Sequence, residues 1–323
     1  MGSAIPVNLA SVVALITVAM TTPAQAHDDH CAAIKASVEE AGFSDRVSVT
    51  CSGDSGIISS DTYPDHPKMI GITGTNEQVP VPAEYAVPVI LSPSLGSKPL
   101  TRDAAIGVAV NGVPIYDYTA GGEMSEADLA HHQARHDTVQ TGQLDICGGH
   151  AGRGDDYHYH AKPTCMINQM ANAGNDAIIG WGFDGFPIYG DNNPDGTEIA
   201  KGVLDICNGQ PDDVFGYRYH TSESAPYILQ CLMGAVPGFD QLPRVRPLSA
   251  SGGGGASAGK PPRGGVKNLE FTEASDGSRS MDYMYEGSRY YIRYTPSGRA
   301  GCYEFKTKTV TNNGRDKSGE FCR

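Results

Sequence analysis

Hydrophobic and polar residues alternate over several short segments of this chain. Alternation with a period of two is typical of a strand that is buried on one face. It predicts strands at residues 46–51, 85–91 and 106–110, whereas 31–42 and 123–135 suit short helices. Glycine and proline are frequent between these segments (Gly 40, Pro 21), as expected for many turns. The sequence therefore predicts a mainly β fold with a few short helices.

The first apolar segment has a different character. Residues 1–26 carry no charged side chain, and an apolar run at 10–20 precedes Ala24-Gln25-Ala26, the small-x-small form of a signal cleavage site. The run is shorter than the roughly 20 residues that cross a bilayer. We therefore expect a signal peptide at 1–26, a periplasmic or extracellular location, and no membrane span in the rest of the chain.

All eight cysteines follow this segment, where an exported chain meets oxidising conditions. They lie as close neighbours separated by long gaps, which favours sequential pairing among the many connectivities that eight cysteines allow. The expected disulfides are Cys31–Cys51, Cys147–Cys165, Cys207–Cys231 and Cys302–Cys322. Zinc bound by cysteine is the alternative, but the C-x-x-C spacing of such sites is absent.

The carboxyl-terminal part differs from the rest in composition. Residues 241–266 are rich in Gly, Ser and Pro and contain no acidic residue, which predicts a flexible linker. Strand-like pieces separated by turn signals follow at 281–285, 289–294 and 302–310, so 267–323 is expected to form a small β module. Residues 27–240 then form the main body.

The body contains an internal duplication, with units at about 104–170 and 177–235. Asn-Gly-Val-Pro-Ile-Tyr at 111–116 returns as Asp-Gly-Phe-Pro-Ile-Tyr at 184–189, Leu-Asp-Ile-Cys at 144–147 returns at 204–207, and Tyr-His-Tyr-His at 157–160 returns as Tyr-Arg-Tyr-His at 217–220. Gln210 and Arg218 thus stand where the first unit has His150 and His158.

Charge is unevenly distributed along the chain. The net charge is −13, but residues 1–240 carry 10 Lys/Arg and 29 Asp/Glu, whereas 241–323 carry 14 and 8. The acidic body argues against nucleic acid as a partner. The basic tail is suited to contact an anionic surface.

The histidines of Tyr-His-Tyr-His at 157–160 are the sharpest chemical feature. On a strand, His158 and His160 point to one face and the two tyrosines to the other. Two imidazoles at this spacing can bind one transition metal, zinc or copper, and His150 is the natural third ligand if the preceding loop folds back. The alternative is an ordinary hydrogen-bonded histidine pair beside a layer of packed tyrosines.

Carboxylates supply two further candidates. Asp184 replaces Asn111 at the matching turn, where it could complete a His/Asp metal set or serve only as a turn residue. Asp191, Asn193 and Asp195 resemble the start of a calcium loop, although the Glu expected at its twelfth position is missing. Calcium is therefore a second candidate cofactor, with a polar turn as the alternative.

Longer motifs surround these residues, at 64–66, 106–115, 147–150, 157–160, 182–190, 204–209 and 226–231. With them, residues 57–235 resemble the YHYH-domain family of exported proteins. The resemblance implies a domain and not a reaction. The family's pattern adds His66 to the candidates for the first site. It leaves His220 alone in the second unit, where Gln210 and Arg218 depart from the pattern.

Three functions remain open at this point, and whether the protein is an enzyme stays open with them. The preferred one is a transition-metal site built from His150, His158 and His160, with His66, Asp184 and His220 as additional candidates. The second is a metal-free module that binds the cell envelope or a polysaccharide through the basic tail. The third is a hydrolase that uses His160 with Asp184.

Overall fold

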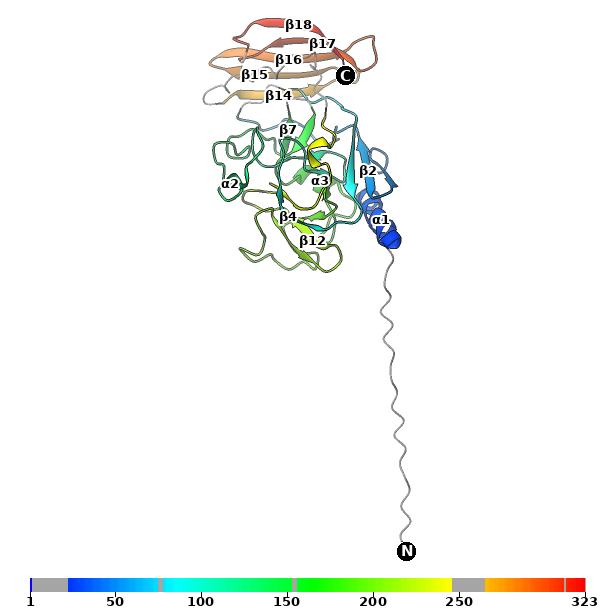
Figure 1. The fold of residues 1–323 in the computed structure, drawn as a ribbon. Helices are drawn as coiled ribbons and strands as arrows, with labels where there is room; N and C mark the ends of the chain where they lie inside the picture. Colours follow the sequence, from blue (N-terminus) through cyan, green and yellow to red (C-terminus); the bar gives the residue numbers. More distant parts are fainter. Residues whose placement is uncertain (2–22, 75–77, 153–155, 246–264, 311, 323) are drawn as a thin grey trace.

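The computed structural model describes residues 1, 23–74, 78–152, 156–245, 265–310 and 312–322. Residues 2–22 of the expected signal peptide and 246–264 of the expected linker lie outside this part of the chain. The described residues are mainly β, as predicted, and form four sheets. Figure 1 shows the carboxyl-terminal sheet, orange to red, stacked over one end of a body that holds the other three. Among the described helices, none is both long and apolar enough to cross a bilayer.

A helix and a small antiparallel sheet form the amino-terminal part of the body. The elements are α1 (Pro23–Ala41), β1 (Ser48–Ser52), β2 (Ser55–Ser60) and β3 (Tyr85–Ile90). Ile34 and Val38, one helical turn apart, are buried in the same apolar cluster as Ile58 and Val87 of the strands. The helix begins earlier than the segment 31–42 that the sequence indicated.

An eight-stranded sheet occupies the centre of the body. Its strands are β5 (Gly107–Ala109), β6 (Pro114–Ile115), β7 (Gly149–Ala151), β8 (Tyr157–Tyr159), β9 (Gly180–Gly182), β10 (Pro187–Tyr189), β11 (Gly209–Asp212) and β12 (Gly216–His220). Most of these strands are buried on both faces, with Val108, Trp181 and Ile188 among the least exposed residues. A strand buried on both faces shows no alternation in its sequence.

The two halves of this sheet have the same internal order. The sheet runs β11-β12-β10-β9-β5-β6-β8-β7, so β9-β10-β12-β11 repeats β5-β6-β8-β7 outward from the centre. In both halves the first pair is antiparallel, the second parallel and the third antiparallel. β5 and β9 join the halves in antiparallel fashion. This matched pairing supports the internal duplication of the sequence, which remains a prediction.

Four disulfides staple the chain, in the sequential pairs that the spacing favoured. Cys31–Cys51 ties α1 to β1, and Cys302–Cys322 joins the last two strands. Cys147–Cys165 and Cys207–Cys231 each close a loop in one half of the central sheet. The part of the chain that is described contains no free cysteine.

Short elements fill the remaining connections. They are α2 (Glu126–Leu129), α3 (Thr164–Gln169), the 3₁₀ turn η1 (Phe239–Gln241), and the antiparallel pair β4 (Leu95–Leu100) and β13 (Leu232–Gly234). The helix predicted at 123–135 is wrong in its length, because it ends after one turn. Beyond it, the ring of His132 binds the buried carboxylate of Asp137, and the N–H of Gln133 donates to the hydroxyl of Tyr118. These tertiary contacts replace further helical turns.

The carboxyl-terminal module is a five-stranded antiparallel meander. Its strands are β14 (Lys267–Glu273), β15 (Arg279–Tyr285), β16 (Ser288–Pro296), β17 (Cys302–Lys308) and β18 (Asp316–Cys322). Met281 and Ile292 on one face share an apolar cluster with Met69, Val81 and Ala151 of the body. The module therefore packs on the body next to strand β7.

Candidate metal centre

Three histidines meet at the edge of the central sheet. β7 and β8 pair with His150 opposite His158, and His160 follows two residues after His158 on the same face. The ligand atoms of the three rings lie within 4.8 Å of one another, and Nε2 of His158 is 3.0 Å from Nε2 of His160. The three residues are only 8%, 4% and 4% exposed. We call them the histidine trio.

Each ring of the trio has its Nδ1 next to a backbone carbonyl. Nδ1 of His150 lies 3.0 Å from the oxygen of Gln143, and Nδ1 of His158 lies 3.2 Å from that of Asp156. Nδ1 of His160 contacts the carbonyl oxygen of Asp117. A carbonyl can only accept a hydrogen bond, so each Nδ1 carries the hydrogen and each Nε2 keeps its lone pair in the neutral ring.

Burial lowers the pKa of two rings of the trio, His150 and His160. It lowers the pKa of His150 to about 3, and the neighbouring His158 lowers it further. Burial likewise holds the pKa of His160 well below its ordinary range, with added repulsion from the other two rings. Neutral imidazoles are the form that binds a metal ion. Their lowered pKa keeps His150 and His160 in this form.

Neighbouring side chains fix the orientation of these rings. Tyr116 stacks on His158 with ring centroids 4.1 Å apart. A carboxylate oxygen of Asp156 lies 3.4 Å from Nδ1 of His158, the arrangement by which carboxylates orient metal-ligating histidines. A Cβ on Gly152 would lie 2.4 Å from Cε1 of His158, so any larger residue at position 152 would clash with this ring. Tyr116, Asp156 and Gly152 carried no signal in the sequence that marked them as part of the site.

A buried carboxylate anchors the hairpin that carries the trio. Oδ1 of Asp145 accepts hydrogen bonds from the backbone N–H groups of Cys147 and Gly149, and the hydroxyl of Tyr157 donates to the same carboxylate. Burial raises the pKa of Asp145 to about 6. Asp205 repeats these contacts in the second half with its own cysteine, glycine and tyrosine. Both aspartates thus hold the turn that precedes their hairpin.

In the second half, the side chains at the position equivalent to the trio bind one another. Gln210 lies opposite Arg218 in the register of β11 and β12, as His150 lies opposite His158. Nε2 of Gln210 and Nε of Arg218 donate to Nε2 of His220 over 3.0 and 2.9 Å. Arg218 also pairs with Asp212. A fixed positive charge therefore stands in the second half where the first half gathers three lone pairs.

Residues 84–199 match the family model described as YHYH protein. This segment, less than half of the chain, is therefore identified as a YHYH domain. The match includes the whole histidine trio and ends before β11, so it is shorter than the resemblance at 57–235 that the motifs suggested. No curated protein and no solved structure matches the chain.

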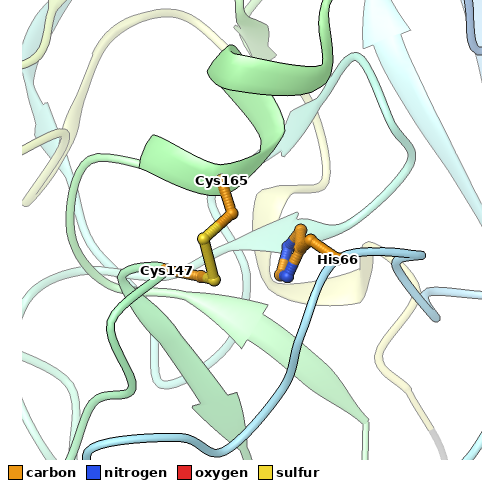
Figure 2. A group of neighbouring side chains, drawn as sticks. All are labelled: His66, Cys147 and Cys165. Atoms are coloured by element: carbon orange, nitrogen blue, oxygen red, sulfur yellow. A yellow bond between two sulfur atoms is a disulfide. The ribbon is translucent and has the colours of Figure 1, made fainter.

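His66 lies on the other face of the YHYH strand from the trio. Its Nε2 contacts the hydroxyl of Tyr159 over 2.7 Å, and its Nδ1 lies 2.8 Å from the carbonyl oxygen of Pro67. Figure 2 shows its ring beside the disulfide between Cys147 and Cys165. Because both sulfurs are tied up in that disulfide, the group has no thiolate to offer a metal. His66 packs with the tyrosine layer of the domain and does not join the trio.

Asp184 and His220 belong to the second half. Oδ2 of Asp184 accepts hydrogen bonds from the hydroxyl of Tyr219 over 2.5 Å and from the N–H of Gly234 over 2.8 Å. Burial raises the pKa of Asp184 to about 6. In the first half Asn111 contacts Tyr159 at the matching position. Neither Asp184 nor His220 shares the ligand grouping of the trio, and the structure shows no contact between Asp184 and His160 among the described residues.

The oxygen atoms of the candidate calcium loop already have protein partners. Asp195 accepts from Thr197, and Asn193 accepts from Gln210 and Arg218. Asp191 contacts Lys162 and Thr221. Within the described ranges these side chains do not gather into a ligand group. The segment has the contacts of the polar turn that was the alternative interpretation.

Proposed function

We infer that the YHYH domain binds one transition-metal ion, zinc or copper, through Nε2 of His150, His158 and His160. The observation that carries this proposal is the 3.0 Å distance between Nε2 of His158 and Nε2 of His160. In neutral rings both nitrogens hold lone pairs, because both Nδ1 atoms face carbonyl oxygens. Two lone pairs at this distance repel each other unless a cation lies between them.

The dimensions of the trio suit such an ion. Zinc binds histidine nitrogen at about 2.0–2.1 Å in tetrahedral sites, which places two ligand nitrogens about 3.3 Å apart. The observed separation of 3.0 Å needs only a small adjustment of the two rings. Three neutral imidazoles are also a donor set that copper accepts. A metal held by three protein ligands keeps a position for water, and it would supply a water of lowered pKa.

The chain's own residues would keep this site selective and dry. Asp156 and the backbone carbonyls hold the ring hydrogens on Nδ1, so no ring turns away. Burial excludes bulk water from the ligand atoms. Four disulfides fit an exported protein, and we propose a periplasmic or extracellular location for the metal-bound form.

Metal content of the purified protein tests the proposal. We expect about one equivalent of zinc or copper to bind the wild type, as three ligands form one site. The variant His158→Ala/His160→Ala should bind none. The control His131→Ala/His136→Ala removes two exposed histidines and should keep the metal. Equal metal content in both double variants, or no binding by the wild type after zinc or copper is added, would contradict the proposal.

A further inference from the structure

Arg102 is a buried charge with incomplete hydrogen bonding. The residue is 2% exposed and precedes the central strand β5. Its Nη2 donates to the carbonyl oxygen of Leu242 over 3.0 Å. Nε and Nη1 are buried and have no hydrogen-bond partner among the described residues. Three N–H bonds of a permanently charged group therefore lack an acceptor.

The surroundings of Arg102 do not compensate its charge. The guanidinium lies over the ring of Phe239, with its central carbon 5.4 Å from the ring centroid. The described chain forms no ion pair with Arg102. Asp240 is exposed. The side chain of Asp103, the residue that follows Arg102, accepts a hydrogen bond from the backbone N–H of Gly122. Burial accordingly lowers the pKa of Arg102.

Tyr85 is a second buried donor without an acceptor. It is 5% exposed, and its hydroxyl has no hydrogen-bond partner within the described part of the chain. Burial raises the pKa of Tyr85 and the charge of Arg102 lowers it, so the two groups interact electrostatically. One hydroxyl and three N–H bonds of these interacting groups thus have no hydrogen-bond partner among the described residues.

Backbone pairing connects the segment that follows Arg102 with the histidine trio. The N–H of Ile106 donates to the carbonyl oxygen of Ile115, which places the segment before β5 beside Tyr116. Tyr116 stacks on His158. The segment before β5 is therefore joined to the trio through Tyr116.

We propose that Arg102 and Tyr85 bind a small oxyanion, a carboxylate or a phosphate. Leaving a buried charge or donor without a partner is costly, and native proteins rarely do so. Every free atom here is a donor, so the partner must accept several hydrogen bonds. Because the guanidinium is charged, an anion compensates it better than water does. The proposal does not require a metal in the trio.

Thermal unfolding in matched salts tests the site. Sodium phosphate, sodium acetate and sodium chloride are compared at equal ionic strength, with a chelator present. At about 100 times its Kd, the bound oxyanion should raise the Tm of the wild type by roughly 5–10 °C relative to chloride. Whether phosphate or acetate gives the larger shift distinguishes the two ligand classes. Arg102→Met should lose the shift, whereas Arg244→Met, a change at an exposed arginine nearby, should keep it.

Two further variants keep the test decisive. Tyr85→Phe removes one hydroxyl, should fold, and should weaken binding of the effective anion about 10-fold, the size of one lost hydrogen bond. His158→Ala/His160→Ala should retain the anion shift, so failure of the metal proposal is distinguishable from failure of this one. The proposal is overturned if neither oxyanion stabilises the wild type beyond chloride. It is also overturned if the shift is equal in Tyr85→Phe and the wild type.

Discussion

A single methyl group at Gly152 should disable the histidine trio. A Cβ at this position would lie 2.4 Å from Cε1, 3.2 Å from Nδ1 and 3.4 Å from Nε2 of His158. Atoms in unstrained contact are about 3.5–4.0 Å apart, so in Gly152→Ala the ring must move by about 1 Å. Ligand positions in metal sites tolerate about 0.2 Å. We expect the affinity for zinc or copper to fall more than about 100-fold, beyond the effect of changes outside the ligand shell.

The fold should survive this change. The backbone of Gly152 is not in the left-handed region, so alanine can adopt its conformation. The second half carries Asp212 at the matching position, where Arg218 replaces the imidazole. Affinity is measured by competition with a chromophoric chelator, and folding by thermal unfolding in the presence of excess chelator. Gly298→Ala is the control, because a Cβ there meets nothing within 4 Å. Wild-type affinity in Gly152→Ala would refute the assignment of His158 as a ligand.

Two other predictions use the second half of the sheet. Replacing Gln210, Asp212 and Arg218 by His, Gly and His gives the second half the residues of a three-histidine site. This triple variant should bind about two equivalents of metal per chain in place of about one. Metal analysis that still finds one equivalent would show that the halves are not equivalent. Asp184 has a pKa of about 6 against 3.8 in the unfolded chain, so the wild type should lose on the order of 3 kcal/mol of unfolding free energy as the pH rises between these values. The variant Asp184→Asn, which has the residue found at Asn111 in the first half, should not show this loss of stability. Denaturant unfolding of both proteins at about pH 4 and about pH 7 measures it. An identical pH dependence in both proteins would show that the Asp184 carboxyl does not cause the loss.

Local sequence signals were sufficient for the disulfides and for the face that His158 and His160 share. Cysteines close in sequence pair readily because short loops cost little entropy to close. Side chains two residues apart on a strand must point the same way, whatever the rest of the fold does. His150 was also a candidate from the sequence, because it follows Cys147 and a loop that folds back would bring it to the pair. In the structure, Asp145 anchors this loop.

The sequence was less informative about helix length and about partners from distant segments. The helix expected at 123–135 ends early because His132 contacts Asp137 instead of continuing the helix. The family's pattern made His66 an additional candidate for the first site, but the structure places it against Tyr159 on the opposite face of the strand. A motif records which residues occur together and not on which side of a sheet each one packs.

The sequence by itself determined the β-rich class, the paired cysteines, the repeated motifs and the three histidines of the first unit. Only the tertiary structure decided that the ring hydrogens of the trio point outward to carbonyls, so that the three Nε2 lone pairs converge. It also decided that Arg218 fills the equivalent position of the second half, and that Arg102 is buried with no ion pair to any described residue. Orientation and burial depend on contacts between segments far apart in the chain, and local patterns do not encode these contacts.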